Sequence, residues 1–163
     1  MTKSGLTVGF RRDKDIPKLI SRMPNTIGYM GSDVLLEVAE GVKGPIAVAV
    51  IGRLAARFAV GARQEEASEM SQRLKDGEDL RWVTSNPKQL MAYAERNGFR
   101  IGELFCVGGS VEAVLGDIPD FDVVLDIVDT GGSMRRSKLE IIQDNVASIA
   151  LIGICQKSVV SQK

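Results

Sequence analysis

The sequence predicts an α/β protein with a largely parallel sheet. Apolar, β-branched segments alternate along the chain with segments of helical period, and strands separated by helices of roughly 10 to 15 residues are typical of βαβ units. Glycine and proline mark the joints between these segments, as at Pro87 and Gly98. The chain has 163 residues, of which 44% are hydrophobic. That composition is enough for one sizeable core or for two small lobes.

Strands are expected wherever β-branched and aliphatic residues form a short apolar run. The IAVAVI run after Pro45 is long enough to cross a core. Two further apolar segments, residues 139–143 and 147–155, continue the pattern in the tail. In chain order the expected strands are residues 5–10, 26–30, 45–50, 55–60, 80–84 and 100–107.

Helices are expected where a cap or a first-turn proline precedes a segment of helical period. Pro17 stands in the first turn of the first helix, and Ser32 or Asp33 could cap the second. Gly98 closes the fourth. In chain order the expected helices are residues 14–23, 33–39, 64–75, 87–97 and 109–115.

Residues 121–134, FDVVLDIVDTGGSM, form the most informative segment. An apolar run with acids at Asp122 and Asp126 stops at a DTGGS turn, and a charged segment compatible with a helix follows. The two glycines permit positive φ and close approach of a ligand, while Thr130 and Ser133 place hydroxyls beside outward-pointing N–H groups. Such a turn can hold a phosphate. The alternative is a plain strand-to-helix connection capped by either hydroxyl, and this segment alone favours that alternative.

Charge and composition argue against several classes of function. Lys and Arg number 21, as do Asp and Glu, so nothing suggests a nucleic acid or an anionic membrane as partner. No apolar run reaches the ~18 residues of a membrane span, and the N-terminus lacks a signal-peptide core, which together predict a cytoplasmic protein. Histidine is absent, which removes Ser-His and Cys-His nucleophile systems and the usual zinc sites.

Several blocks of sequence resemble one family of enzymes. They are DIP at residues 15–17, GYMGSDVLLE at 28–37, RWVTSNPKQLMAYAERNG at 81–98, and GSVE at 109–112 with the later DIVDTGGSM loop. In this order they resemble the catalytic domain of ATP phosphoribosyltransferase, the enzyme that opens histidine biosynthesis. The similarity runs from about Leu6 to about Ile152, and the last loop is its most specific part.

The resemblance implies a two-lobed fold of the periplasmic-binding-protein type II, with mostly parallel sheets and two crossings of the chain between the lobes. Lobe I would comprise residues 1–51 plus 135–163, and lobe II would comprise residues 52–134 with the phosphate-binding turn. The ligand cleft would lie between the lobes, where the C-terminal ends of strands and the N-termini of helices converge.

The resemblance also implies the reaction, which condenses ATP with phosphoribosyl pyrophosphate to give phosphoribosyl-ATP and pyrophosphate. Positioning and electrostatics would supply most of the catalysis. Glu112 would lie close to the reacting purine or the sugar, and Asp126 near the ribose hydroxyls. Mg²⁺ would be bound mainly through substrate oxygens and water. The implied phosphate site consists of Asp129, Thr130, Gly131, Gly132 and Ser133.

Two further substrate-binding candidates follow from the resemblance, Arg12 for a phosphate and Asp33 at the edge of the cleft. Each site residue also has a structural interpretation. An arginine such as Arg12 is most often a solvated strand end, Asp33 is assigned to capping before catalysis, and Glu112 stabilises a first helical turn by itself. For Asp126, the alternation of side chains leaves both a buried and a solvent-facing position open.

Departures from the family pattern leave the function open. In family members an opening strand and a K-G-R motif precede the point where this chain begins, so lobe I is expected to lack its first strand. The Ser133 hydroxyl stands where the family has threonine. The chain has no room after Ile152 for the regulatory domain of the long form. A short form would be expected to work as a homo-oligomer or with a regulatory subunit resembling a histidyl-tRNA synthetase.

Two main hypotheses follow. In the first, the chain is a short-form, N-terminally truncated ATP phosphoribosyltransferase, a glycosyltransferase that is active if its missing N-terminal part is supplied. In the second, it is a catalytically inactive binding or assembly module of the same fold, either a pseudoenzyme or a fragment, that keeps the phosphate turn. A third hypothesis is a ligand-sensing domain of binding-protein type whose anion differs.

Overall fold

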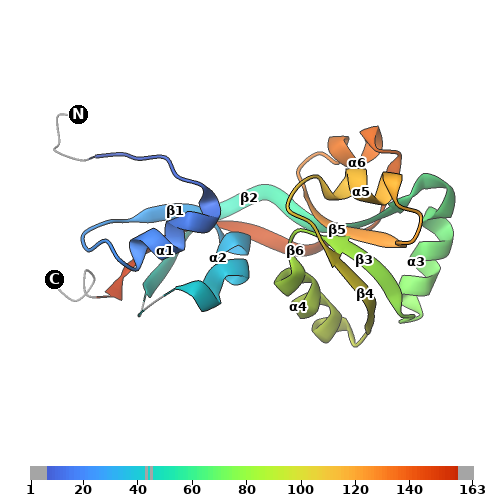
Figure 1. The fold of residues 1–163 in the computed structure, drawn as a ribbon, viewed down its shortest axis with the longest axis horizontal. Helices are drawn as coiled ribbons and strands as arrows, with labels where there is room; N and C mark the ends of the chain where they lie inside the picture. The colour runs from blue at the N-terminus through green and yellow to red at the C-terminus, as the bar shows by residue number, and fades with distance from the viewer. Residues whose placement is uncertain (1–6, 43, 45, 158–163) are drawn as a thin grey trace. The chain divides into compact units, whose positions relative to one another are not determined.

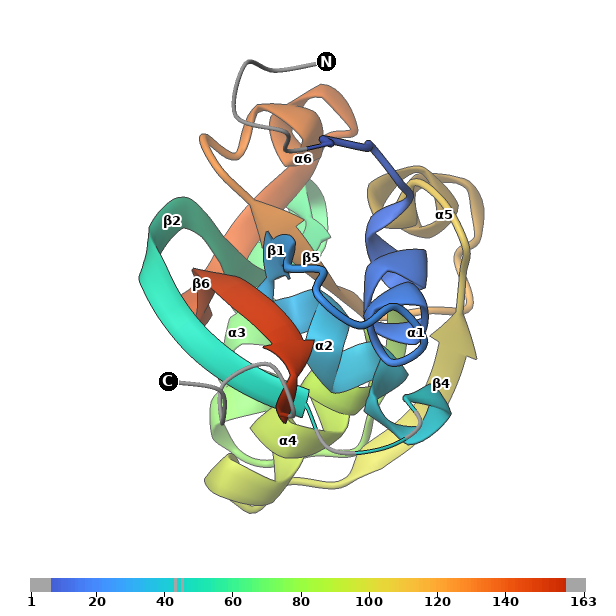
Figure 2. The same cartoon turned by 90° about the vertical axis from the view of Figure 1, so that its left-hand side faces the viewer.

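The computed structural model describes residues 7–157 except residues 43 and 45. The chain divides into two compact units, unit 1 (Met1–Gly52 with Leu151–Lys163) and unit 2 (Arg53–Ala150). Two long strands, β2 (Ile46–Arg63) and β6 (Leu139–Gln156), run through both units (Figures 1 and 2). The predicted lobe division, 1–51 plus 135–163 and 52–134, stays a prediction; the second boundary between the compact units falls inside β6.

Unit 1 contains two short helices, α1 (Ile16–Ile20) and α2 (Ser32–Val38), and the edge strand β1 (Gly28–Gly31). Strand β1 pairs antiparallel with the end of β6, with Met30 opposite Ile152. The buried side chains of this unit include Pro17, Ile20, Met30, Val34, Ile152 and Ile154. Tyr29, whose side chain alternates with that of Met30, is exposed. One face of this part of the sheet is therefore buried, and the opposite face is open at Tyr29.

A glycine lets α1 pack closely on β1. A Cβ atom placed at Gly28 would lie 2.5 Å from Ile16 Cγ2 and 3.0 Å from Ile20 Cγ1. Real Cβ atoms do not tolerate the shorter of these distances, so any larger residue would push the helix away from the strand. The glycine at this position is thus required by close approach of two elements.

The sheet of unit 2 is built around three parallel strands. They are β3 (Leu80–Thr84), β4 (Ile101–Cys106) and β5 (Val123–Val128), and β3 pairs with both of the others in parallel. Strand β5 pairs antiparallel with β2. The hydrogen-bonded order through the whole sheet is β1-β6-β2-β5-β3-β4. Parallel pairing, as predicted, is therefore found in the β5-β3-β4 part, while the β1–β6 and β2–β5 pairs are antiparallel.

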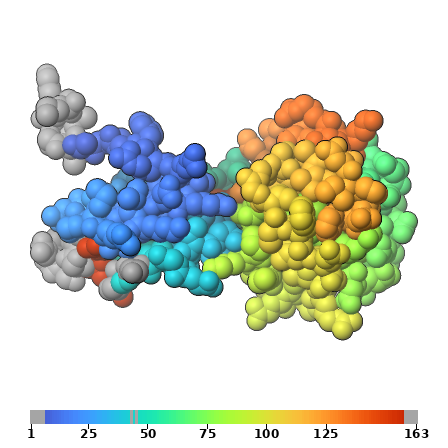
Figure 3. Space-filling model, viewed as in Figure 1, coloured from blue at the N-terminus to red at the C-terminus, as the bar shows by residue number. Residues whose placement is uncertain are grey.

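Helices cover both faces of this sheet. Helices α3 (Ala67–Lys75) and α4 (Pro87–Asn97) pack on one face around the buried Trp82. Helices α5 (Val111–Asp117) and α6 (Gly132–Arg136) pack on the other, around a second core that includes Val124 and Val128. Side chains along β5 alternate between the two cores, which explains why the strand is almost entirely apolar. Helices α5 and α6 lie close together on the surface of unit 2 (Figures 1 and 3).

Arg63, the last residue of β2, ties α5 to the sheet. Its guanidinium donates hydrogen bonds to the backbone carbonyls of Leu115 at 2.8 Å, Ile118 at 2.6 Å and Phe121 at 2.9 Å. Carbonyls at the end of a helix have no partner within the helix, so a partly buried cation there satisfies acceptors that would otherwise be unpaired. The contact fixes α5 against the start of β5.

Several predicted elements were wrong in extent. The segments 45–50 and 55–60 join into β2, and the segments 139–143 and 147–155 join into β6, because pairing with neighbouring strands overrides local break signals such as Gly52. The helix predicted over 14–23 is reduced to α1, preceded by a 3₁₀ turn at Asp13–Asp15. Of the strand predicted over 5–10, residues 7–10 form no strand, and residues 5 and 6 lie outside the described part. Within the described ranges, no helix is long and apolar enough to cross a membrane.

Candidate active site

The strongest candidate site lies at the C-terminal end of β5, in unit 2. Asp126 of β5 pairs with Ala59 of β2. Side-chain alternation places Asp126 on the same face as Val124 and Val128, which belong to the core beneath α5 and α6. Of the two positions that the sequence left open, the structure therefore selects the one that faces the helices. Asp126 is partly buried there.

Glu112 approaches Asp126 from the first turn of α5. Hydrogen bonding by its own backbone N–H and by the side chains of Ser110, Ser133 and Asp126 favours the charged form of the Glu112 carboxylate. Burial by itself would raise the pKa of Glu112, but these hydrogen bonds outweigh burial and lower it. Glu112 is therefore ionised at neutral pH. The residue does what its first-turn position predicts, and it also contacts two other segments of the chain.

Asp126 has the opposite protonation tendency. Burial raises its pKa, and the neighbouring charge of Glu112 raises it further, to about 7, against the lowering effect of the Ile127 N–H. That N–H donates to Asp126 Oδ1 over 2.8 Å. A protonated Asp126 can donate its hydroxyl hydrogen to the ionised Glu112, so one proton is shared between the two carboxyl groups. Such a pair places a hydrogen-bond acceptor, the ionised Glu112, beside a proton donor, the protonated Asp126.

The glycine turn follows Asp126 directly. Gly131 has a φ of 72°, in the left-handed region, and stands immediately before α6. A Cβ atom there would meet Ile141 Cδ1 at 3.2 Å, so both the backbone conformation and the space favour glycine. The side chains of Asp129 and Thr130 are exposed, whereas Ser133 is partly buried and bonded to Glu112. The turn thus brings the predicted phosphate site next to the carboxyl pair.

Sequence reasoning missed two cations beside this turn. Arg135 Nη1 lies 3.3 Å from the Cβ position of Gly131, and Arg136 Nη1 lies 3.5 Å from that of Gly132. Both arginines are exposed, and neither forms an ion pair within the described residues. The signal was available, because an Arg-Arg pair follows the glycine turn directly in the sequence.

Arg12 and Asp33 belong to unit 1. Arg12 is exposed and begins the 3₁₀ turn, to which it contributes its backbone carbonyl. Asp33 is in the first turn of α2, where burial raises its pKa and the N–H groups of Asp33 and Val34 partly offset the rise. Gly31, and not Ser32 or Asp33, occupies the N-cap position. The predicted capping by Ser32 or Asp33 is therefore wrong, although Asp33 lies in the first turn of the helix. The part of Asp33 in substrate binding stays a prediction.

Asp122, the other acid of the FDVVLD run, has a structural role. Its carboxylate accepts hydrogen bonds from the backbone N–H of Arg81 at 2.8 Å and from Arg81 Nη2 at 2.9 Å. These contacts lower its pKa against the effect of burial. Asp122 thereby joins the starts of β3 and β5. It lies outside the carboxyl pair.

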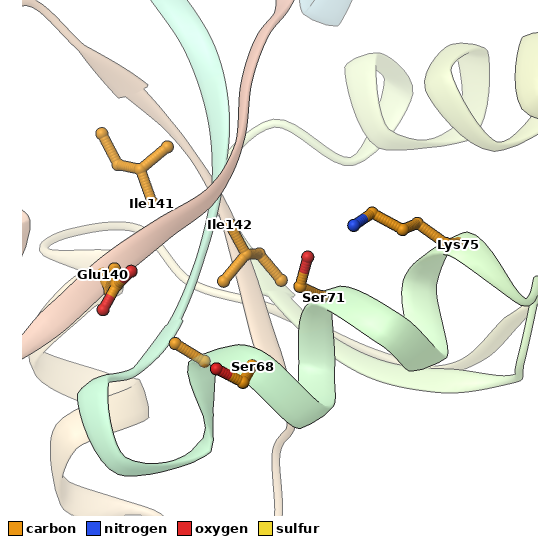
Figure 4. Close-up of a pocket in the computed structure, with 7 residues that line it drawn as sticks. Ser68, Ser71, Lys75, Glu140, Ile141 and Ile142 are labelled. Atoms are coloured by element: carbon orange, nitrogen blue, oxygen red, sulfur yellow. The ribbon is translucent and has the colours of Figure 1, made fainter.

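A surface pocket of unit 2 lies away from this site. It has a volume of about 330 Å³ and is situated between α3 and β6 (Figure 4). Its lining residues are Ala67, Ser68, Ser71, Lys75, Glu140, Ile141 and Ile142. None of the predicted site residues lines it. Within the described ranges, no three His, Cys, Asp or Glu side chains group closely enough to hold a metal ion.

A protein-family comparison decides the relationship of this chain to known proteins. The model of HisG, described as ATP phosphoribosyltransferase, matches residues 12–163. The chain belongs to the HisG family. The family predicted from the DIP, GSDVLLE and DTGGS motifs is therefore confirmed.

Two curated members of the HisG family give the degree of similarity. An ATP phosphoribosyltransferase of Symbiobacterium thermophilum is 26% identical over 133 residues, which are 82% of this chain and 57% of that protein. One of Micrococcus luteus is 27% identical over 150 residues, which are 90% of this chain and 50% of that protein. The chain thus spans about half the length of the curated relatives it matches.

A solved structure shows the fold. The ATP phosphoribosyl transferase (HisG:HisZ) complex from Thermotoga maritima superposes with a TM-score of 0.66 at 22% identity, covering 93% of this chain and 69% of that chain. The predicted α/β class of the periplasmic-binding-protein type II is confirmed by this likeness. The likeness concerns the fold, and the roles of Glu112, Asp126 and the glycine turn are argued from the geometry of unit 2.

Proposed function

We propose that this HisG-family chain binds phosphoribosyl pyrophosphate and ATP and takes part in forming phosphoribosyl-ATP and pyrophosphate. In this reaction a purine ring nitrogen forms a bond to C1 of the ribose while the bond from C1 to the diphosphate oxygen breaks, with its electron pair leaving on the diphosphate. Positive charge spreads over the sugar in the transition state. A site for it needs fixed negative charge near the ribose and fixed donors and cations near the phosphates.

One observation carries the proposal. Three side chains act together on the pKa of the Glu112 carboxylate, those of Ser110 in the loop before α5, Asp126 in β5 and Ser133 at the start of α6. These segments include the parts of unit 2 that carry the family motifs. A plain strand-to-helix connection would not need a half-buried pair of carboxyl groups that share a proton beside a glycine turn.

The carboxyl pair supplies two different groups to a bound ribose. Ionised Glu112 would stabilise the positive charge that develops on the sugar or the purine. Asp126, whose pKa is raised to about 7 by burial and by Glu112, would donate to or accept from the ribose hydroxyls according to its protonation state. Because the two groups differ only in environment, the division of roles depends on the contacts that keep Glu112 ionised.

The turn after Asp126 would hold the 5′-phosphate. The backbone N–H groups of residues 130–133 and the hydroxyl of Thr130 are the donors that we assign to it. The Ser133 hydroxyl is engaged with Glu112, so it would have to turn toward an incoming phosphate. Asp129 begins the turn. Arg135 and Arg136 would add positive charge for phosphate or diphosphate oxygens.

The remaining assignments rest on the family. Arg12 and Asp33 in unit 1 are proposed as further substrate contacts. Mg²⁺ is proposed to neutralise the diphosphate, bound through its oxygens and water, because Mg²⁺ keeps several waters and shares substrate phosphates. We also propose a cytoplasmic location and assembly as a homo-oligomer or with a regulatory subunit, since the solved HisG structure similar to this chain is a HisG:HisZ complex.

Calorimetric titration with phosphoribosyl pyrophosphate and Mg²⁺ tests the proposal. The wild-type chain should bind, and Thr130→Ala/Ser133→Ala should lose most of the affinity while remaining folded. Ser68→Ala, which changes an exposed hydroxyl on α3, is the matched control and should bind like wild type. Binding would justify an assay of pyrophosphate release with ATP. A folded chain that binds no phosphoribosyl pyrophosphate would contradict the enzyme proposal and leave the non-catalytic module.

A further inference from the structure

Arg57 contacts the backbone at the start of the phosphate turn. This residue of β2 pairs with Val128, the last residue of β5. Its side chain therefore reaches the residue that follows, and Nη1 donates a hydrogen bond to the carbonyl oxygen of Asp129 over 2.7 Å. Asp129 is the first residue of the turn, so the contact is made where the chain leaves the sheet.

Asp144 holds the guanidinium in place for this contact. Its carboxylate accepts two hydrogen bonds from Arg57, from Nε and Nη2, both over 2.8 Å. The Asn145 N–H donates to the same carboxylate over 2.7 Å, and Asn145 has a φ of 52°. This local turn inside β6 presents Asp144 to Arg57. The three segments β2, β6 and the turn are thus joined by one planar, oriented cation.

The geometry uses the properties that distinguish arginine from lysine. Two donors on one edge of the guanidinium form the fork that matches a carboxylate, and a third donor is left pointing at the carbonyl. An ion pair with Asp144 alone would need only the two donors that face its carboxylate. The third contact fixes the carbonyl of Asp129. The N–H of Thr130 belongs to the same planar peptide group and points the opposite way, so its direction is fixed as well.

We propose that Arg57, oriented by Asp144, is a positioning residue for the phosphate turn and so for the affinity of the 5′-phosphate. The inference rests on the proposed function of that turn. Arg57 itself does not touch the reacting atoms in this scheme. It holds the Thr130 amide in the direction in which a phosphate would meet it, because a small displacement of a binding group costs a large part of its effect.

Two readouts test this inference, and the first does not depend on substrate. Amide hydrogen exchange of residues 130–135 should become about tenfold faster in Arg57→Lys and in Asp144→Asn, since the tether that limits local opening is lost. Arg53→Ala is the matched control, because Arg53 lies on the same strand, is exposed and has no ion pair within the described residues. Its exchange should match wild type. Trp82 fluorescence checks that each variant remains folded.

The second readout is the dissociation constant for phosphoribosyl pyrophosphate with Mg²⁺, measured beside that for ATP. Arg57→Lys and Asp144→Asn should weaken phosphoribosyl pyrophosphate binding by roughly tenfold to a hundredfold and leave ATP binding unchanged. A merely structural role would weaken both ligands, and a merely electrostatic role would leave Arg57→Lys like wild type. Either result would overturn the inference.

The two proposals fail in different ways. If the wild-type chain binds no phosphoribosyl pyrophosphate, the proposed function is wrong. Hydrogen exchange then tests by itself whether Arg57 and Asp144 hold the turn in place. If exchange at 130–135 is unchanged in Arg57→Lys and Asp144→Asn, the positioning inference is wrong whatever the chain binds. A folding defect in one variant does not remove the test, because the arginine and the aspartate are changed separately.

Discussion

The carboxyl groups of Glu112 and Asp126 shift each other's pKa, although Glu112 lies in the first turn of a helix and Asp126 lies within a strand. The two acids have opposite pKa shifts, upward for Asp126, chiefly through burial, and downward for Glu112, where hydrogen bonding outweighs burial. Neither shift follows from residue type. Both follow from which neighbour each carboxyl group finds in the fold, and the pair stands directly before the turn that we assign to phosphate.

Replacement of Asp126 by asparagine should remove a pH dependence of stability. The pKa of Asp126 in the folded protein, about 7, lies above its ordinary value of 3.8, so the folded state binds this proton more tightly than the unfolded state does. The free energy of unfolding should therefore fall as pH rises from about 4 to about 7, by about 2 to 4 kcal/mol. Asp126→Asn should lack that decrease.

Urea unfolding at a series of pH values measures this effect. Trp82 is the single tryptophan and is buried in unit 2, so its fluorescence reports on the unit that contains Asp126. Glu112 does not interfere, because its lowered pKa affects stability only below its ordinary value of 4.5. A wild-type profile that is flat between pH 4 and pH 7 would contradict the raised pKa.

Removal of the two turn hydroxyls should give different results. Ser133→Ala deletes a donor to Glu112, so the pKa of Glu112 should rise toward its ordinary value. As the pH is lowered, the variant should therefore lose its affinity for phosphoribosyl pyrophosphate at a higher pH than wild type does. Thr130→Ala should weaken binding by about tenfold at every pH, since no contact to Glu112 is lost. Calorimetric titrations at several pH values compare the two. Identical pH profiles would show that Ser133 does not support Glu112.

Loss of the two arginines beside the turn should weaken anion binding in a salt-dependent way. The double variant Arg135→Ala/Arg136→Ala should bind phosphoribosyl pyrophosphate about tenfold less tightly at low salt, and the difference should shrink at high salt because both side chains are exposed. Arg135→Lys/Arg136→Lys keeps the charge and should retain part of the affinity. The measurement is the dissociation constant at two ionic strengths, and equal values for wild type and the alanine variant would exclude both arginines from the site.

Gly28→Ala should destabilise unit 1 without touching the candidate site. The added Cβ would lie 2.5 Å from Ile16 Cγ2, and the separation of α1 from β1 should cost about 1 to 3 kcal/mol. Gly52→Ala is the control, since a Cβ there has no neighbour within 4 Å. Hydrogen exchange of the β1 amides measures the effect. Unchanged protection in Gly28→Ala would show that the helix does not pack on this glycine.

Local signals predicted most elements of unit 2 well. The strand at Leu80–Thr84 and the helix at Pro87–Asn97 have the predicted bounds, because an apolar run, a first-turn proline and a closing glycine act within a few residues of sequence. The long strands were predicted as separate pieces. Their continuity depends on pairing with distant strands, and such pairing leaves no signal in the segment itself.

The candidate site divides in the same way. The motifs identified the turn, Glu112 and Asp126 as separate features, and each had an ordinary structural explanation. The sequence could not tell which face Asp126 occupies, since acids and aliphatic residues alternate irregularly around it. Arg57 carried no signal at all, because its contact with Asp129 joins residues that are distant in the chain and adjacent only through strand pairing.

The sequence by itself determined the α/β class, the family, the order of most elements and the place of the glycine turn, because these depend on residue type and short spacing. Only the tertiary structure decided that Glu112, Asp126 and Ser133 meet, that one carboxyl group keeps its proton while the other loses it, and that Arg57 and Asp144 hold the turn. The physical reason is that burial, charge proximity and hydrogen-bond geometry depend on distances through space, and chain folding sets those distances.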